Sequence, residues 1–252
     1  MKNVYVSTSN TAAFLDAIDA VERRGASEAC LMVVDGDPGR GKTCTAQWYA
    51  LRHRAPYLRA KREWTPPWLL RELLAELRVQ PERSFEQMFR QALTALGQRA
   101  EAARRAGEPF SVILDEVDHI VRSSSIMDTV RDLSDYIEVP FVLIGMGRVR
   151  SAIARYPQTA SRVAQYLQFV DLTVEDVAKL VSARCECPVD ADLLALLTDT
   201  AKGYSREVLE GIAAIERHGK RLGRPVTIAD MAGRTLMNDR ATGRPIIVRE
   251  AP

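Results

Sequence analysis

Short apolar runs alternate with longer segments of mixed character over the first two thirds of the chain. Leu31–Val34, Ser111–Leu114 and Phe141–Ile144 are the clearest runs, and Pro56–Ala60 and Leu167–Asp171 are weaker ones. Runs of this length suit strands that are buried on both faces of a parallel sheet. The pattern therefore predicts an α/β fold whose core is a five-stranded parallel sheet flanked by helices.

The segments between these runs favour helices because apolar residues recur three or four positions apart. Residues 11–24 show the pattern well, since Phe14, Ile18 and Val21 share one face and Gly25 follows as a stop signal. The prolines of Trp64-Thr-Pro-Pro-Trp68 fall in the first turn of another helix, where they are tolerated. Helices are predicted over residues 11–24, 44–54, 64–77, 84–106 (as one helix or two), 126–136, 151–155 and 161–166.

Strand character ends near residue 173, and the rest of the chain is expected to be helical. Three helices are predicted at Val174–Arg184, Asp190–Ala201 and Ser205–His218, with a fourth over 227–236. The residues after Asn238 are basic and include Gly243 and Pro245, so they are expected to form a mobile tail. The predicted domains are an α/β core over residues 1–173, a small all-helical lid over 174–237 and a basic tail over 238–252.

A glycine-rich loop follows the first strand, and its sequence is Gly36-Asp-Pro-Gly-Arg-Gly-Lys42-Thr43. It matches the pattern G-x-x-x-x-G-K-[ST] of phosphate-binding loops. Its glycines let the backbone N–H groups approach phosphate oxygens, Lys42 can reach the β- and γ-phosphates, and the Thr43 hydroxyl can hold Mg²⁺. A glycine-rich surface turn is the alternative, but the strand before the loop and the helix after it favour nucleotide binding. The predicted nucleotide-binding residues are Gly36, Asp37, Pro38, Gly39, Arg40, Gly41, Lys42, Thr43 and Cys44.

A second motif, Asp115-Glu116, ends the apolar strand that begins after Phe110. Ligands of open α/β sheets collect at the carboxyl ends of parallel strands, so Asp115 is expected to hold Mg²⁺. Glu116 is then placed to orient and deprotonate an attacking water. A solvated strand end would explain the two acids alone, but their position after a phosphate loop favours ATP hydrolysis with Mg²⁺.

Composition excludes few function classes. No apolar run approaches the roughly 20 residues that span a bilayer, and the N-terminus lacks the apolar core of a signal peptide, so a cytoplasmic protein without a membrane segment is expected. Cys185-Glu-Cys187 has metal-like spacing but no second pair nearby, so packing is favoured over zinc. The net charge of +2 is too small to indicate a nucleic-acid partner. One basic cluster, which is a candidate for phosphate contacts or a solvated face, consists of Arg52, Arg54, Arg59, Lys61 and Arg62.

Together, the two motifs, the α/β core and the helical lid resemble the AAA+ ATPases. The resemblance implies that Arg206, in Gly203-Tyr-Ser-Arg206, is the second sensor and contacts the γ-phosphate of ATP. It also implies that Arg162, in Ala160-Ser-Arg162-Val, is an arginine finger for the ATP of a neighbouring subunit. With Lys42 and Glu116, these arginines form the expected catalytic set. The first-sensor position departs from the family, because Gly145-Met146-Gly147-Arg148 stands where a polar residue is usual, and slow hydrolysis is expected.

Within that family, the compact core and Trp64-Thr-Pro-Pro-Trp68 look most like Mu-like phage transposition protein B and related transposon target-selection ATPases. The similarity covers about residues 5–236. It implies a homo-oligomer, as a head-to-tail helical filament or ring, that binds double-stranded DNA without sequence preference and delivers it to a transposase. Arg59, Lys61 and Arg62 are the expected DNA contacts. The helix-turn-helix domain that precedes the Mu protein's core has no room here, since the first strand begins near residue 31.

Three other functions remain open at this stage. A replication initiator or helicase-loading AAA+ ATPase would also act on DNA, although such proteins usually carry a recruiting domain that the short tail after Asn238 cannot supply. A nucleotide-regulated switch directed at protein partners would show no DNA binding in ATP. A secretion-type relative is disfavoured because it would carry a membrane segment.

Overall fold

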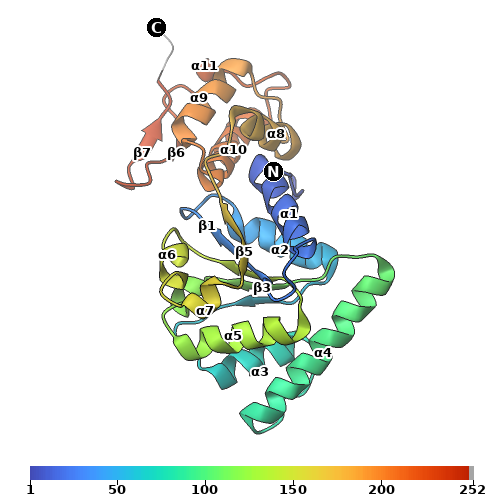
Figure 1. Cartoon of the computed structure of the whole chain (residues 1–252). Coiled ribbons are helices and arrows are strands. Elements are labelled where there is room, and N and C mark those ends of the chain that lie inside the picture. The colour runs from blue at the N-terminus through green and yellow to red at the C-terminus, as the bar shows by residue number, and fades with distance from the viewer. Residues whose placement is uncertain (250–252) are drawn as a thin grey trace. The chain divides into compact units, whose positions relative to one another are not determined.

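The computed structural model describes residues 1–249, and their contacts divide them into two compact units (Figure 1). The α/β unit consists of Ala13–Asp37 and Lys42–Phe169. The helical unit consists of Met1–Ala12, Pro38–Gly41 and the chain from Val170 onward. The predicted α/β core covered residues 1–173. The contacts instead group the first twelve residues and the tip of the glycine-rich loop with the helical unit.

The α/β unit is built on a parallel sheet with the strand order β2-β3-β4-β1-β5, which confirms the predicted five-stranded parallel sheet. The inner strands have the buried side chains that their apolar runs predicted, since each is covered on both faces. The strands are β1 (Leu31–Asp35), β2 (Tyr57–Arg59), β3 (Val112–Asp115), β4 (Phe141–Ile144) and β5 (Val163–Gln168).

Two apolar clusters cover the two faces of this sheet. On one face, Leu31 and Val33 of β1 pack with residues of α3, α4 and α5. On the other face, Met32 and Val34 pack with α1 and α2, including Phe14. The helices of this unit are α1 (Ser9–Glu22), which begins in the helical unit, α2 (Lys42–His53), α3 (Pro66–Glu76), α4 (Phe85–Ala106), the 3-10 turn η1 (Val117–His119), α5 (Ser124–Ile137), α6 (Val149–Ile153) and α7 (Pro157–Ala160).

Local signals explain where these helices begin and end. Thr65 caps α3 by accepting a hydrogen bond from the Trp68 N–H, and prolines occupy its first turn. Ser84 and Gln87 form a capping box at the start of α4, and Gly107 ends it in a left-handed conformation. Residues 84–106 therefore form one helix after the Ser84 cap.

The helix predicted over residues 161–166 is wrong. The chain there forms β5, which begins at Val163 and not at Leu167 as the sequence suggested. β5 is an edge strand that pairs only with β1, and its side chains are partly or fully exposed. It therefore lacks the continuous apolar run that marks the inner strands.

The helical unit contains α8 (Val174–Arg184), α9 (Ala191–Ala201) and α10 (Ser205–Gly219), close to their predicted bounds. The fourth helix is shorter than predicted, because α11 (Ile228–Met231) ends before Gly233, whose φ is +73°. An antiparallel hairpin follows, formed by β6 (Thr235–Asn238) and β7 (Pro245–Ile247).

This hairpin corrects the prediction of an all-helical lid and a mobile tail. Leu236, Met237 and Val248 are buried in the apolar cluster of the helical unit, so the chain through Val248 belongs to its packed structure. Residues 250–252 of the predicted tail lie outside the described residues. The two strands of the hairpin are short and flank a polar turn. The basic composition of the segment therefore gave no sign of a strand.

Candidate functional site

The glycine-rich loop begins at a position that only glycine can occupy. Gly36 has a φ of +135°, and a Cβ there would lie 2.6 Å from the backbone oxygen of Phe169. Lys42, at the start of α2, is almost buried and folds back over the loop. Its Nζ donates to the carbonyl oxygens of Gly36 at 2.6 Å and Asp37 at 2.9 Å. The ammonium is thus held within reach of any anion that the loop binds.

Thr43 and Asp115, the predicted metal ligands, come together at the carboxyl end of the sheet. The Thr43 hydroxyl donates to Asp115 Oδ2 at 2.7 Å, and Tyr57 donates to the same oxygen at 2.8 Å. A hydroxyl and a carboxylate side by side are the oxygen ligands that Mg²⁺ prefers next to phosphates. Burial and the Asp115 carboxylate raise the pKa of Tyr57, so this phenol remains a donor. The sequence did not indicate Tyr57, because nothing near it distinguishes it from the other tyrosines. The pairing of β2 with β3 brings it to Asp115.

Glu116 follows Asp115 in a left-handed conformation with a φ of +57°. Its carboxylate forms an ion pair with Arg59, at the end of the neighbouring strand β2. The hydrogen bond from Arg59 lowers the pKa of Glu116. The residue predicted as the general base is therefore bound to a residue predicted to contact DNA, a pairing that the sequence did not suggest.

Arg59→Ala is expected to raise the rate of ATP hydrolysis measured without DNA by roughly two- to fivefold, because a general base works best when it is free and its pKa is nearer neutrality. Since Arg59 lowers the Glu116 pKa, the acid limb of the pH–rate profile should move to higher pH in the variant. Steady-state phosphate release between pH 4 and pH 8 measures both effects. Lys61→Ala removes a nearby charge that does not contact Glu116 and serves as the control. An unchanged rate and profile would show that the ion pair does not restrain the base.

The loop after β4, where the sequence lacks a polar first sensor, contacts a different acid. The Met146 N–H donates to Asp118 Oδ2 at 2.7 Å. Gly145 permits this approach, because a Cβ there would lie 2.6 Å from the same oxygen. Asp118 lies in η1, two residues after Glu116, and is the polar group that the sequence reasoning missed at this position.

The tip of the glycine-rich loop is anchored within the helical unit. The Ser205 hydroxyl donates to the Gly39 carbonyl at 2.7 Å, and the Arg206 N–H donates to it at 3.3 Å. Arg40 pairs with Asp171 at 3.0 Å. Arg206 is thus located beside the phosphate loop through its backbone, in the first turn of α10, with its side chain exposed.

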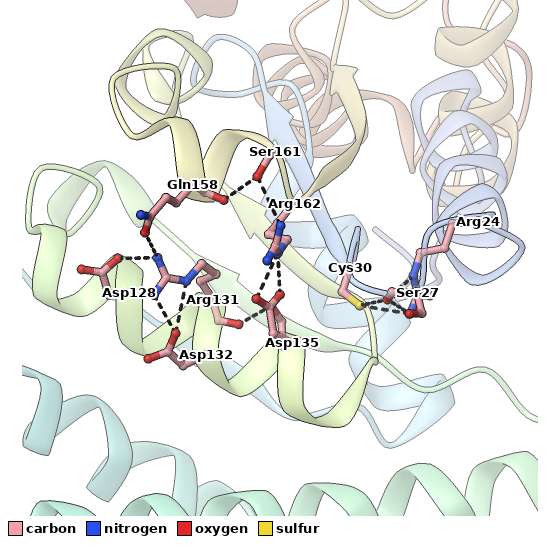
Figure 2. Close-up of polar contacts among 11 residues, drawn as sticks. Arg24, Ser27, Cys30, Asp128, Arg131, Asp132, Asp135, Gln158, Ser161 and Arg162 are labelled. Atoms are coloured by element: carbon pink, nitrogen blue, oxygen red, sulfur yellow. Dashed lines mark hydrogen bonds and ion pairs between the residues drawn. The ribbon is translucent and has the colours of Figure 1, made fainter.

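Arg162, the predicted arginine finger, lies just before β5 and points toward α5 (Figure 2). Its Nε is 3.0 Å from both carboxylate oxygens of Asp135. Arg131, also on α5, pairs with Asp128 and Asp132. Arg162 therefore has an acidic partner within its own chain, and its role toward a neighbouring subunit stays a prediction.

A family model described as an AAA domain matches residues 23–153, which is more than half of the chain. The chain belongs to the AAA domain family. The match spans the phosphate loop, the Asp115-Glu116 motif and four of the five strands, so the AAA part of the predicted resemblance is confirmed and nucleotide binding follows from it. No curated protein matches this chain in sequence.

Solved structures with the same fold include ORC and CDC6 proteins that are only 15–17% identical to this chain in sequence. The ORC2 protein of Aeropyrum pernix, solved as ADPNP–ADP complexes, has a TM-score of 0.66 over 90% of this chain and 68% of its own. The ORC1 protein of Aeropyrum pernix in complex with DNA has a TM-score of 0.61 over 89% of this chain and 64% of its own. CDC6P of Pyrobaculum aerophilum has a TM-score of 0.58 over 91% of this chain and 68% of its own. At these identities the similarity shows the AAA fold alone.

The remaining DNA candidates of this AAA domain lie after β2. Lys61 pairs with Glu72 at 2.5 Å and lies over the Trp68 ring, 5.5 Å from its centroid. Arg62 is exposed.

Between residues 1 and 249, no helix has both the length and the apolar character required to cross a membrane. Within the same range, no three side chains of the His, Cys, Asp and Glu types gather where they could hold a metal ion. The assignment of Thr43 and Asp115 as cation ligands stays a prediction.

Proposed function

We propose that this chain is an ATPase that hydrolyses ATP with Mg²⁺ and binds duplex DNA under nucleotide control. The observation that carries the proposal is the convergence of Lys42, Thr43, Asp115 and Glu116 at one end of the sheet. Lys42 and the loop N–H groups would bind the phosphates, and Glu116 would accept the proton of the attacking water. Mg²⁺, held by Thr43 and Asp115, would neutralise charge on the phosphate oxygens.

Two arginines would complete the reaction. Arg206, in the helical unit, would contact the γ-phosphate of its own chain's nucleotide. Arg162 would reach the nucleotide of the next subunit, which requires a head-to-tail homo-oligomer that closes into a ring or continues as a helical filament. Its Nε donates to Asp135 and its Nη1 donates to Ser161 Oγ at 3.4 Å, so in this role Nη2 would reach the phosphate.

The proposed task is to bind DNA without sequence preference and to deliver it to a transposase as a target. The resemblance to transposition protein B supports this assignment, and the exposed Arg62 and the neighbouring Lys61 supply positive charge for backbone contacts. A second candidate is a replication initiator or helicase-loading ATPase. The similarity to the ORC and CDC6 structures, one of them solved with DNA, favours it. A switch directed at protein partners remains as the outcome in which ATP induces no DNA binding.

The first test measures ATP turnover with and without random-sequence duplex DNA, together with DNA affinity across a range of salt concentrations. DNA-stimulated turnover, salt-dependent binding and filaments visible by negative-stain imaging are expected. Reversing both charges in Lys61→Glu/Arg62→Glu should weaken binding equally for all sequences and flatten the salt slope by about two ion equivalents. Arg90→Glu, an exposed reversal on α4, is the control. Turnover that ignores DNA would remove the DNA function and favour a protein-directed switch, whereas binding confined to one sequence would favour the initiator.

A further inference from the structure

The turn of the C-terminal hairpin, between β6 and β7, has a fixed conformation. Asp239 Oδ1 accepts hydrogen bonds from the N–H groups of Ala241 at 3.1 Å and Thr242 at 2.7 Å, and from the Thr242 hydroxyl at 2.7 Å. The Asp239 N–H donates to the Arg244 carbonyl at 2.7 Å. These bonds close the turn and determine where its second residue, Arg240, is presented.

Arg240 contacts the tip of the phosphate loop, within the helical unit. Its Nη2 donates to the Pro38 carbonyl at 2.7 Å, and its Nη1 donates to Glu207 Oε1 at 3.3 Å. The guanidinium lies over the Tyr204 ring, with its carbon 4.4 Å from the ring centroid. A fork that donates in two directions while it stacks on an aromatic ring is a geometry that arginine provides and lysine does not.

The loop is adapted to this approach. A Cβ on Gly39 would lie 2.8 Å from Arg240 Nη1, so a side chain there would displace the guanidinium from its present place. The φ of Gly39, +89°, also disfavours other residues. The turn therefore favours glycine at this position, and the lack of a side chain leaves room for the arginine.

The contact determines where the loop N–H groups point. A peptide unit is planar and trans, so its N–H points away from its C=O. Arg240 holds the Pro38 carbonyl, which turns the Gly39 N–H in the opposite direction. Ser205 holds the Gly39 carbonyl, which orients the Arg40 N–H in the same manner. N–H groups at these positions are the ones that a phosphate loop offers to phosphate oxygens.

We infer that Arg240 is a positioning residue of the nucleotide site, which holds the phosphate loop in its binding conformation through the Pro38 carbonyl. The inference rests on the proposed nucleotide-binding function. Because the loop is oriented before any nucleotide arrives, Arg240 should strengthen ADP and ATP binding equally. It differs in this from Arg206, whose proposed contact is with the γ-phosphate and should favour ATP.

The test compares Arg240→Ala and Arg240→Lys with Arg244→Ala, a control that removes an arginine from the same turn. Affinities for Mg-ADP and Mg-ATP are measured by titration calorimetry, and KM and kcat by phosphate release. Arg240→Ala should weaken both nucleotides about tenfold, equivalent to about 1.4 kcal/mol, and raise KM with kcat unchanged. Arg240→Lys, which keeps the charge, should show most of this loss, and Arg244→Ala should bind as the unsubstituted chain does.

A melting temperature for each variant, read beside KM, separates a role in folding alone, which would lower the melting temperature and the active fraction but leave KM unchanged. ADP affinity in both Arg240 variants that equals that of the unsubstituted chain would overturn the inference, and so would a loss confined to ATP. If the unsubstituted chain binds neither nucleotide, the proposed function itself is overturned. Should Arg240→Ala fail to fold, Arg240→Lys carries the test.

Discussion

Glu116→Gln is expected to bind ATP with near-normal affinity while hydrolysing it at least about 100-fold more slowly, because the amide cannot accept the proton of the attacking water. The substitution keeps the shape of the side chain at a position with a φ of +57°, so the backbone there is not disturbed. It also dissolves the ion pair with Arg59, which leaves that arginine free to bind DNA phosphates. ATP-dependent DNA complexes should therefore persist in the variant.

Single-turnover hydrolysis and nucleotide titration measure the two effects separately. Glu63→Gln, a matched change at an exposed glutamate after β2, should behave as the unsubstituted chain does. Hydrolysis at the normal rate in Glu116→Gln would remove Glu116 from the reaction. Asp118, which faces the loop after β4, would then be the next carboxylate to test.

Lys42→Ala is expected to weaken binding of ATP and ADP by at least about 100-fold, a loss of about 2.7 kcal/mol. The reason is that Lys42 brings a positive charge, sheltered from water, to the inner side of the loop, where it donates to the carbonyls of Gly36 and Asp37. Removing it takes away the phosphate contact and the link that holds the start of the loop.

Fluorescent-nucleotide titration measures this loss, and circular dichroism establishes that the variant is folded. Lys61→Ala, which removes an exposed lysine from the same unit, is the control and should bind nucleotides normally. Normal ADP affinity in Lys42→Ala would show that residues 36–43 do not form a phosphate site in this chain.

The inner strands of the fold could be predicted from sequence because burial on both faces makes them continuously apolar. β1 and β4 show this directly, since every residue of their predicted runs is buried. β5 and the hairpin could not be predicted in the same way. β5 is an edge strand with exposed side chains, and the hairpin buries only a few residues within a basic segment.

The candidate site divides along similar lines. Thr43 and Asp115 could be proposed from sequence because each belongs to a local motif whose residue types indicate its chemistry, and the sheet brings the two motifs together. The contacts that Arg59 and Arg240 make with the motif residues were missed, because these arginines lie far from the motifs in sequence. The pairing of Arg59 with Glu116 and the contact of Arg240 with Pro38 could not be predicted, because the partners lie 57 and 202 residues apart in the sequence. The register of β2 on β3 and the turn of the hairpin, which only folding creates, bring these partners together.

The ion pair between Arg59 and Glu116 implies that DNA binding and nucleotide binding affect each other reciprocally. Under the proposed function, DNA that draws Arg59 away releases Glu116 for catalysis, and linkage requires the reverse effect to be equal in free energy. A nucleotide state that engages Glu116 would then raise the affinity of the protein for DNA by the same factor by which DNA raises the affinity for that nucleotide state. If the proposed function holds, this ion pair would couple the lifetime of a DNA complex to nucleotide turnover.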